Sequence, residues 1–282
     1  MSNKQNKKIK TKKNINKDML DDLNYYDDEI KFDRSYYSNI DYLSNKEKEI
    51  FDNKFSKPRN KSQVLYLSIL SKKNKKITVV TGPAGTGKTL FATEQGIKQF
   101  LLGKIDKLIF TRPSVSVDED LGYLPGTLEE KMAPWIRPIY DILYLFISPT
   151  EVTQLIENKL IEISPLGYMR GRTFKNCWII ADEMQNSTPT QMKMLLTRLG
   201  ENSKLIITGD LDQHDQKFEL NGLDDFLDKF KGRRSESITS VEFDKEDIER
   251  EEVVKEVLEI YSGEDIPIYY QNIIQDENDN IN

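Results

Sequence analysis

The sequence predicts an α/β fold in which a mostly parallel sheet is covered by helices on both faces. Short apolar, β-branched segments alternate along the chain with longer segments of helical periodicity. Polar residues directly follow several of the apolar segments, and ligands gather at the carboxyl ends of parallel strands. The expected strands are 77–80, 107–111, 161–163, 177–181, 204–208 and 240–243, and the expected helices are 60–70, 90–102, 136–146, 152–159, 190–199, 222–230 and 245–261.

The chain of 282 residues is long enough for one large domain with extensions. We expect an N-terminal extension over 1–44, a compact domain over 45–262 that begins with a capped helix, and a flexible acidic tail over 263–282. Residues 1–17 contain seven lysines and no acid, followed by an acidic, tyrosine-rich segment. The basic arm is either a solvated disordered tail, which we favour, or a nucleic-acid tether.

The bulk composition excludes several classes of protein. A net charge of −6 is wrong for a basic nucleic-acid coat, so any polyanion must be met by a local patch. The chain has one cysteine, Cys177, so it cannot form an internal disulfide. With only one histidine, His214, in addition, it offers few ligands for zinc. Cys177 is expected to be a buried thiol in a reducing setting. No apolar stretch approaches the length of a membrane span, so we expect a soluble, cytoplasmic protein with no membrane partner.

A phosphate-binding P-loop, G-x-x-x-x-G-K-[ST], lies between the first expected strand and the helix that follows it. Its backbone N–H groups and the helix N-terminus wrap phosphates, and its glycines permit close approach. Lys88 is expected near the β- and γ-phosphates, and the Thr89 hydroxyl is expected to bind Mg²⁺. The motif comprises Gly82, Pro83, Ala84, Gly85, Thr86, Gly87, Lys88 and Thr89.

Two acids follow the apolar strand 177–181. Asp182 is placed to hold Mg²⁺, directly or through water, and Glu183 to orient or deprotonate an attacking water. Acids after strands are also common helix caps, but the position about ninety residues after a P-loop strengthens the catalytic interpretation.

Two further segments are similar to helicase motifs. The Asp-Glu-x-Gln sequence that ends at Gln185 resembles the second motif of helicase-type ATPases. The Gly-Asp-x-x-Gln sequence that ends at Gln213 resembles the third motif of superfamily 1 helicases, whose glutamine senses the γ-phosphate; an ordinary Asp-rich turn is the alternative. Gln63, 19 residues before Gly82, could bond N6 and N7 of adenine and select ATP over GTP, or could be a solvent-facing helix residue.

Longer runs resemble the PhoH family over roughly residues 60–262. The most specific is Tyr168-Met169-Arg170-Gly171-Arg172-Thr173, and Leu121-Gly122-Tyr123-Leu124-Pro125-Gly126, Asp182-Glu183-Met184-Gln185-Asn186 and Thr197-Arg198-Leu199-Gly200 add to it. The resemblance implies a RecA-like P-loop NTPase core, a link to RNA metabolism and a ring-shaped, often hexameric, homo-oligomer.

The chain departs from the family pattern near the end of the core. Members usually carry an Arg-His pair there, whereas this chain has Arg250 followed by Glu251. Arg250 is a candidate to reach a phosphate in its own or a neighbouring subunit, and Arg172 or Arg170 could act as a finger on a neighbour's ATP. The core arginines and nearby aromatic residues could bind the phosphates and bases of single-stranded nucleic acid. Alternatively, the arginines pair with carboxylates and the aromatic residues pack between subunits.

These patterns together predict a Mg²⁺-dependent ATPase that acts on RNA or single-stranded nucleic acid in a helicase-like manner. Two alternatives stay open: a nucleotide-gated, ring-forming assembly protein with little turnover, and a small-molecule P-loop kinase. The kinase would need a lid over its phosphate acceptor, and the helicase-like motifs argue against it.

Overall fold

A computed structural model of the chain describes residues 44–113, 128–213, 220–249, 253, 254 and 257, with only the backbone for 128–134. Residues 1–43 of the expected N-terminal extension and the expected tail lie outside the described residues, and this division of the chain stays a prediction. The capped helix start near residue 45 is confirmed by α3 (Asn45–Asn53). The Ser44 side chain accepts the Glu47 N–H, and the Glu47 carboxylate accepts the Ser44 N–H, which closes a capping box.

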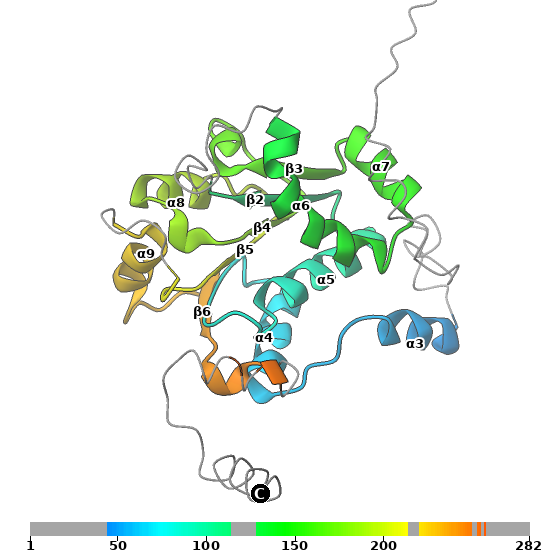
Figure 1. Cartoon of the computed structure of the whole chain (residues 1–282), viewed down its shortest axis with the longest axis horizontal. Helices are drawn as coiled ribbons and strands as arrows, with labels where there is room; N and C mark the ends of the chain where they lie inside the picture. Colours follow the sequence, from blue (N-terminus) through cyan, green and yellow to red (C-terminus); the bar gives the residue numbers. More distant parts are fainter. Residues whose placement is uncertain (1–43, 114–127, 214–219, 250–252, 255–256, 258–282) are drawn as a thin grey trace, which may run out of the picture.

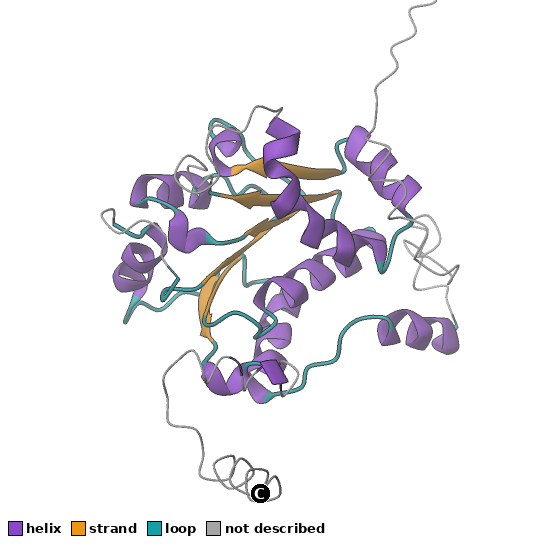
Figure 2. Ribbon diagram, viewed as in Figure 1, coloured by secondary structure: helices purple, strands orange, loops and turns teal. Residues whose placement is uncertain are grey.

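A six-stranded sheet forms the centre of the molecule, in the order β3-β2-β4-β5-β1-β6 (Figures 1 and 2). Every pairing between these strands is parallel, as the sequence predicted. The connection from β1 to β2, which contains the P-loop, passes over β5 and β4, because these two strands lie between β1 and β2 in the sheet. The strands are β1 (Ile77–Thr81), β2 (Lys107–Arg112), β3 (Ile161–Pro165), β4 (Cys177–Ala181), β5 (Lys204–Gly209) and β6 (Ile238–Glu242).

Helices cover both faces of this sheet. On one face α5 packs on the strands, with α4, α6 and α7 beside it, and on the other face lie α8 and α9 (Figures 1 and 2). This three-layer arrangement confirms the predicted α/β class. The α-helices after α3 are α4 (Lys61–Ser71), α5 (Lys88–Leu101), α6 (Leu128–Tyr144), α7 (Pro149–Glu157), α8 (Pro189–Leu196) and α9 (Gly222–Phe230), with single 3₁₀ turns η3 (Leu166–Met169), η4 (Met184–Asn186) and η5 (Lys245–Asp247).

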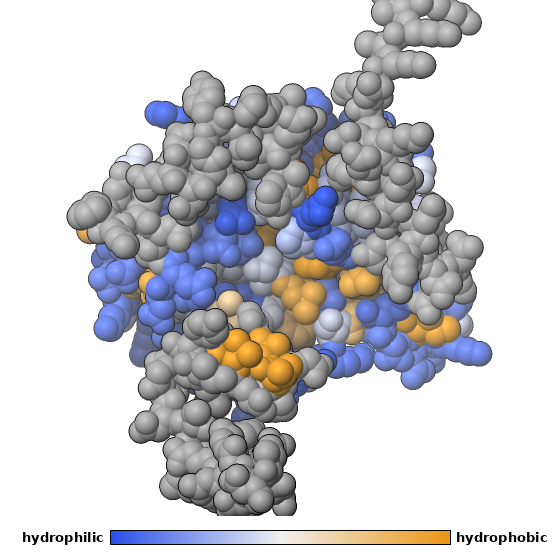
Figure 3. Space-filling view, viewed as in Figure 1, coloured by the Kyte–Doolittle hydropathy of each residue, from blue (hydrophilic) through white to orange (hydrophobic). Residues whose placement is uncertain are grey.

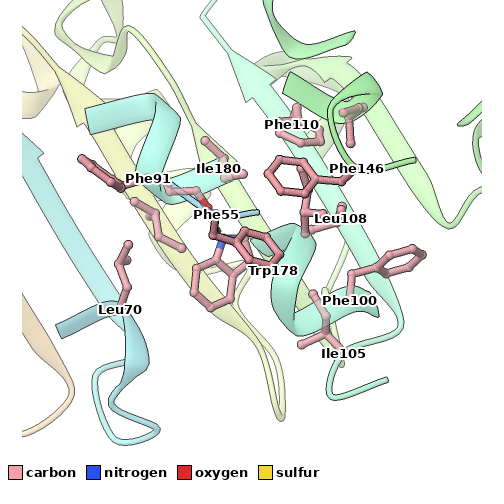
Figure 4. Close-up of a cluster of buried hydrophobic side chains, with 14 of the residues drawn as sticks. Phe55, Leu70, Phe91, Phe100, Ile105, Leu108, Phe110, Phe146, Trp178 and Ile180 are labelled. Carbon is pink, nitrogen blue, oxygen red and sulfur yellow. Dashed lines mark hydrogen bonds between the residues drawn. The ribbon is translucent and has the colours of Figure 1, made fainter. Parts of the chain in front are cut away.

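Alternation along the strands divides the core in two. Val80, Phe110 and Ile180 face α5, whereas their neighbours in sequence face α8 and α9. The α5 side is rich in aromatic side chains, and Figure 4 shows Trp178 among them. The Trp178 indole N–H donates to the Ala92 carbonyl of α5 at 3.0 Å, and Gly96 leaves room for the same ring, since a Cβ there would lie 2.6 Å from Cδ1. The P-loop helix is thereby fixed to the sheet.

The expected helix over 245–261 is wrong at its start. Asp244 accepts the N–H groups of Glu246 and Asp247, and the Asp247 carboxylate accepts the Asp244 N–H, so the turn closes on itself. Ile248 then leaves the helical region with φ −70° and ψ 115°. The capping box therefore encloses a single 3₁₀ turn, and residues 253, 254 and 257 further along are helical. Most of the remaining expected helix lies outside the described residues.

Two other expectations concern Cys177 and membranes. Cys177 is buried, its Sγ–H donates to the Lys175 carbonyl at 2.8 Å, and burial raises the pKa of its thiol to about 11. The prediction of a buried core thiol is therefore confirmed. Within the described part of the chain, no helix combines the length and apolarity needed to cross a bilayer.

Candidate active site

The candidate site lies where β1, β4 and β5 end, at the same edge of the sheet. A cavity of about 370 Å³ opens there, lined by the P-loop on one side and by residues after β4 and β5 on the other. The parallel order brings these three segments together although they span more than a hundred residues of sequence. The lining residues are Ala84, Gly85, Gly87, Lys88, Thr89, Leu90, Asp182, Glu183, Gly209, Asp210 and Gln213.

The P-loop glycines adopt backbone angles that other residues rarely tolerate. Gly82 has φ 133° and Gly87 has φ 88°. A Cβ on Gly82 would lie 2.3 Å from the Phe243 carbonyl oxygen, and one on Gly87 would lie 2.8 Å from the Phe91 ring. Both positions therefore require glycine for space as well as for conformation.

The first turn of α5 points free N–H groups at the cavity. Gly87 is the N-cap of this helix and offers no side-chain oxygen to its N–H groups. A helix N-terminus without such a cap suits an anion, through both its N–H donors and its dipole. This geometry fits the phosphates of a nucleotide.

The Lys88 ammonium bridges the loop. Its Nζ donates to the Gly82 carbonyl at 2.6 Å and to the Pro83 carbonyl at 2.7 Å. Burial lowers the pKa of Lys88, and the carboxylates of Asp210, Asp182 and Glu183 oppose that shift. Lys88 thus sits in the cavity as a hydrogen-bonded donor whose partners are neutral carbonyls, which a phosphate could replace.

Thr89 and Asp182 form a pair of oxygen donors of the kind that Mg²⁺ prefers. The Thr89 hydroxyl donates to the Asp182 carboxylate at 2.9 Å, and the Thr208 hydroxyl donates to the same oxygen. Two ligands at right angles, each about 2.1 Å from Mg²⁺, lie about 3 Å apart. The observed separation therefore fits neighbouring positions on one Mg²⁺ ion, with Thr208 orienting the carboxylate.

Gln185 connects the other predicted residues of this wall. Its side-chain amide donates to the Glu183 carboxylate at 2.6 Å and to the Gln213 carbonyl at 3.3 Å, and its carbonyl accepts the Asp210 N–H at 3.2 Å. Glu183 itself has φ 53°, a left-handed conformation that turns the chain from β4 into η4. Gln185 is 1% exposed, so these bonds are shielded from water.

Gln63 lies behind the P-loop and is 2% exposed, so the solvent-facing alternative is wrong. Its amide donates to the Thr86 carbonyl at 3.1 Å and accepts the Arg59 N–H at 2.8 Å. It does not line the cavity. The structure therefore gives Gln63 a contact with the P-loop backbone, and its contact with adenine stays a prediction.

Two contacts to the P-loop region had no motif to reveal them. The Tyr66 hydroxyl donates to the Lys88 carbonyl at 3.1 Å, and burial raises the pKa of this phenol well above its usual value. The Glu249 N–H donates to the Gly85 carbonyl at 3.1 Å, while the Asn60 side chain donates to the Glu249 carboxylate at 3.3 Å. Asn60 is the N-cap of α4, a position that favours Asn in many helices, so its residue type gave no sign of this contact.

Arg170 and Arg172 do not line this cavity. Arg172 forms a bidentate ion pair with Glu162 of β3, with Nη2 2.7 Å from Oε2, and its guanidinium lies over the Phe174 ring. The Glu162 partner raises the pKa of Arg172. Arg172 therefore has a carboxylate partner in its own chain, and a role on a neighbouring subunit stays a prediction. Arg250 and His214 lie outside the described residues.

The chain matches one protein family and several curated proteins. The family model described as PhoH-like protein matches residues 56–262. The PhoH-like protein of Synechocystis sp. is 50% identical over 148 residues (52% of this chain and 45% of the relative), and that of Bacillus subtilis is 46% identical over 181 residues (64% and 56%). Protein PhoH of Escherichia coli K12 is 40% identical over 207 residues (72% and 57%).

The chain spans about half the length of these curated relatives. Among solved structures, the helicase domain of Pyrococcus furiosus Hef aligns with a TM-score of 0.34 and 14% identity over 65% of this chain and 38% of that one, a likeness too low to inform function. The family match covers most of the chain and its bounds agree with the expected 60–262. The chain therefore belongs to the PhoH-like protein family.

Proposed function

We propose that this protein is a Mg²⁺-dependent ATPase that acts on RNA or single-stranded nucleic acid. The observation that supports this most is the convergence of Lys88, the Thr89–Asp182 pair and Glu183 on one cavity, with Gln213 at its rim. Phosphoryl transfer needs positioning and charge stabilisation more than covalent chemistry, and these residue types supply both.

Each residue has a distinct task in this proposal. Lys88 exchanges its bonds to Gly82 and Pro83 for phosphate oxygens, and Thr89 and Asp182 hold Mg²⁺, which supplies charge neutralisation when it is bound. Glu183 orients a water and accepts its proton. Nucleotide binding in this proposal requires Lys88 to exchange hydrogen-bond partners but no movement of the P-loop backbone. That backbone is already held where Gly82 packs on Phe243 and Gly87 packs on Phe91.

Gln185 supports a role for Gln213 as a sensor. A change at the γ-phosphate that shifts Glu183 would reach Gln213 and Asp210 through the Gln185 amide, since one side chain bonds all three. The ATP-bound and product-bound arrangements would then differ in the segment after β5. This is the kind of two-state element on which a motor depends.

A homo-oligomer, with a ring as its simplest form, follows from the same proposal. The described part of the chain forms one RecA-like unit, and translocating helicases close a cleft between two such units. A neighbouring copy would supply the second surface and an arginine. The assembly-protein alternative predicts ATP-dependent oligomerisation with negligible turnover.

Steady-state ATP hydrolysis by the full chain, with and without single-stranded RNA or DNA, tests the proposal. A mock preparation without the protein gives the background of contaminating activity. Stimulation by one polymer is expected and identifies the substrate class. Turnover at the background level with every polymer would contradict the ATPase assignment and favour the assembly protein.

A further inference from the structure

A basic depression lies on the surface formed by η3, the loop after it and α8. Three cations line it: Arg170 from the loop, Lys193 from α8 and Arg198 just after α8. Its volume is about 450 Å³, and its other lining residues are Gly171, Thr190, Met194 and Thr197. No carboxylate is among these residues, although the chain as a whole is acidic.

The positive charge of this depression is not neutralised by the ion pairs of the described residues. The nearby carboxylates are engaged elsewhere: Glu162 pairs with Arg172, Glu201 with Lys175, and Asp225 with Lys229. The Arg198 guanidinium donates to neutral oxygens, the carbonyls of Met194 and Arg172 and the Thr197 hydroxyl. The three cations therefore present their charge to solvent and to an incoming anion.

The backbone beneath the cations is held in place. Arg172 ties the loop to β3 through Glu162, and the Phe174 N–H donates to the Arg198 carbonyl at 3.0 Å. The Gly200 N–H returns to the Phe174 carbonyl at 2.7 Å. Arg170 and Arg198 thus project from two segments that are hydrogen-bonded to each other, which reduces the entropy lost on binding.

An aromatic side chain accompanies the charges. Tyr168 is 61% exposed, belongs to η3 and precedes Arg170 by two residues. A second, larger groove of about 920 Å³ continues across Thr190, Lys193 and Thr197 toward α9, where Phe226 and Arg233 line it. In Figure 3 the visible coloured surface in the region of α8 and α9 is mainly hydrophilic.

We propose that the Arg170–Lys193–Arg198 depression, together with the exposed Tyr168 two residues before Arg170, binds single-stranded nucleic acid. This inference rests on the proposed function and assigns its polymer to a surface. Cations that follow the phosphates, combined with an aromatic ring on which a base can stack, are the combination that single strands require. An acidic peptide would use the cations but would have no use for the exposed ring.

The position of this surface also connects it to the candidate active site. Glu183 and Gln185 lie immediately before α8, and Lys193 lies on that helix. Thr188 caps α8 through a capping box with Gln191, and the Gly222 N–H donates to the Ser187 carbonyl at 2.6 Å. A displacement of Glu183 would therefore be passed along a short, tightly held segment to Lys193 on α8 and Arg198 just after it.

The test measures binding of fluorescein-labelled U20 and dT20 by anisotropy over a range of salt. The test variant is the double substitution Arg170→Ala/Lys193→Ala, because both side chains are exposed. Each phosphate contact to a single strand releases about 0.7 counterion. We expect the salt slope to fall by about 1.4 and the affinity to fall roughly 25-fold at 0.1 M salt. Lys73→Ala/Lys104→Ala removes the same charge from exposed lysines outside the depression and should leave both nearly unchanged.

The outcomes separate the two proposals. If the wild-type protein binds neither polymer, the nucleic-acid part of the proposed function fails and this surface fails with it. If the wild type binds and the Arg170→Ala/Lys193→Ala variant binds equally well, or no worse than the lysine control, only the surface assignment is overturned. A normal affinity with reduced basal ATP turnover in Arg170→Ala would instead make Arg170 a finger on a neighbouring subunit.

Tyr168→Leu tests the stacking element separately. Removing one stacked base contact should reduce affinity about tenfold without changing the salt slope. Equal affinity would remove Tyr168 from the binding surface. Poly-glutamate serves as a competitor without bases: competition as effective as that of unlabelled U20 would show that the depression attracts any polyanion and would overturn the assignment.

Discussion

The two walls of the candidate active site are held by different kinds of force. On the P-loop wall, tight packing around glycines adds to the hydrogen bonds that hold the loop: Gly82 is packed against Phe243, and Gly87 against Phe91. We call the opposite wall the switch wall; it comprises Asp182, Glu183, Gln185, Asp210 and Gln213. The side-chain hydrogen bonds of Gln185 hold this wall in shape. The first wall is rigid because atoms are in contact, whereas the second can change because hydrogen bonds can be exchanged.

This difference separates binding from turnover. A rigid P-loop wall provides a preformed cradle, so damage to it should weaken nucleotide binding and stability together. The switch wall carries the groups that respond to the γ-phosphate, so damage there should slow turnover while binding persists. The following substitutions test this division, beginning with the largest expected effect.

Glu183→Gln should separate the two walls most clearly. The amide keeps the size of the side chain but cannot accept a proton from water, so turnover should fall about 10²- to 10⁴-fold. ATP affinity, measured by fluorescence of a labelled nucleotide, should change by less than about threefold. Turnover equal to that of the wild type would remove Glu183 from the mechanism, and a comparable loss of affinity would deny the division between the walls.

Gly82→Ala should break the P-loop wall. The added Cβ would lie 2.3 Å from the Phe243 carbonyl oxygen at a φ of 133°, so strain and overpacking together should lower the free energy of unfolding by about 2–5 kcal/mol. Denaturant unfolding and nucleotide binding measure the two effects. Gly167→Ala is the matched control, because a Cβ there meets nothing within 4 Å. A Gly82→Ala protein with normal stability would show that this wall is not rigid.

Gln185→Ala should damage the switch wall without touching the phosphates. It leaves the Asp210 N–H and the Glu183 carboxylate without a buried partner, at about 1–3 kcal/mol. We expect turnover to fall about 10- to 100-fold and ATP affinity to change little. Gln191→Ala, which removes only the capping glutamine of α8, controls for general loosening of that helix. Equal effects of both substitutions would argue that Gln185 acts only by supporting the fold.

Gln63→Ala has the smallest expected effect on activity and tests whether the P-loop wall also reads the base. Loss of the bond to the Thr86 carbonyl should reduce stability by about 1–3 kcal/mol. If Gln63 also contacts adenine, the preference for ATP over GTP should shrink. A loss of stability with an unchanged preference for ATP over GTP would show that Gln63 stabilises the P-loop and does not contact the base. Gln154→Ala, on the exposed side of α7, is the control.

The sequence predicted much of this fold because its signals are local. Every expected strand was found, since apolar runs of strand length such as Cys177–Ala181 are buried on both sides. The helix expected from Lys245 was wrong at its start, where Asp244 caps a single 3₁₀ turn that ends at Ile248, although residues 253, 254 and 257 are helical. Helix α5 begins at Lys88 and not at residue 90, because the P-loop itself supplies the first turn.

The candidate site was predictable to a similar degree. Lys88, Thr89, Asp182 and Glu183 belong to motifs whose spacing is set by the strands that carry them, and the structure brings them together with Gln213. Gln63 was placed near the nucleotide, but its bond to the Thr86 carbonyl was not foreseen. The pairing of Arg172 with Glu162 agrees with the alternative that core arginines pair with carboxylates, but the partner was not foreseen, because no periodicity links β3 to the loop after η3.

By itself the sequence determined the α/β class, the six strand segments, the P-loop and the acids after β4, because each of these depends on neighbours along the chain. The tertiary structure decided the strand order, the bonds of Gln185 to three separate segments, the carbonyl partners of Lys88 and the gathering of Arg170, Lys193 and Arg198. These contacts are decided by how helices and strands pack in space. Most of them join residues distant in sequence, about which local propensity carries no information.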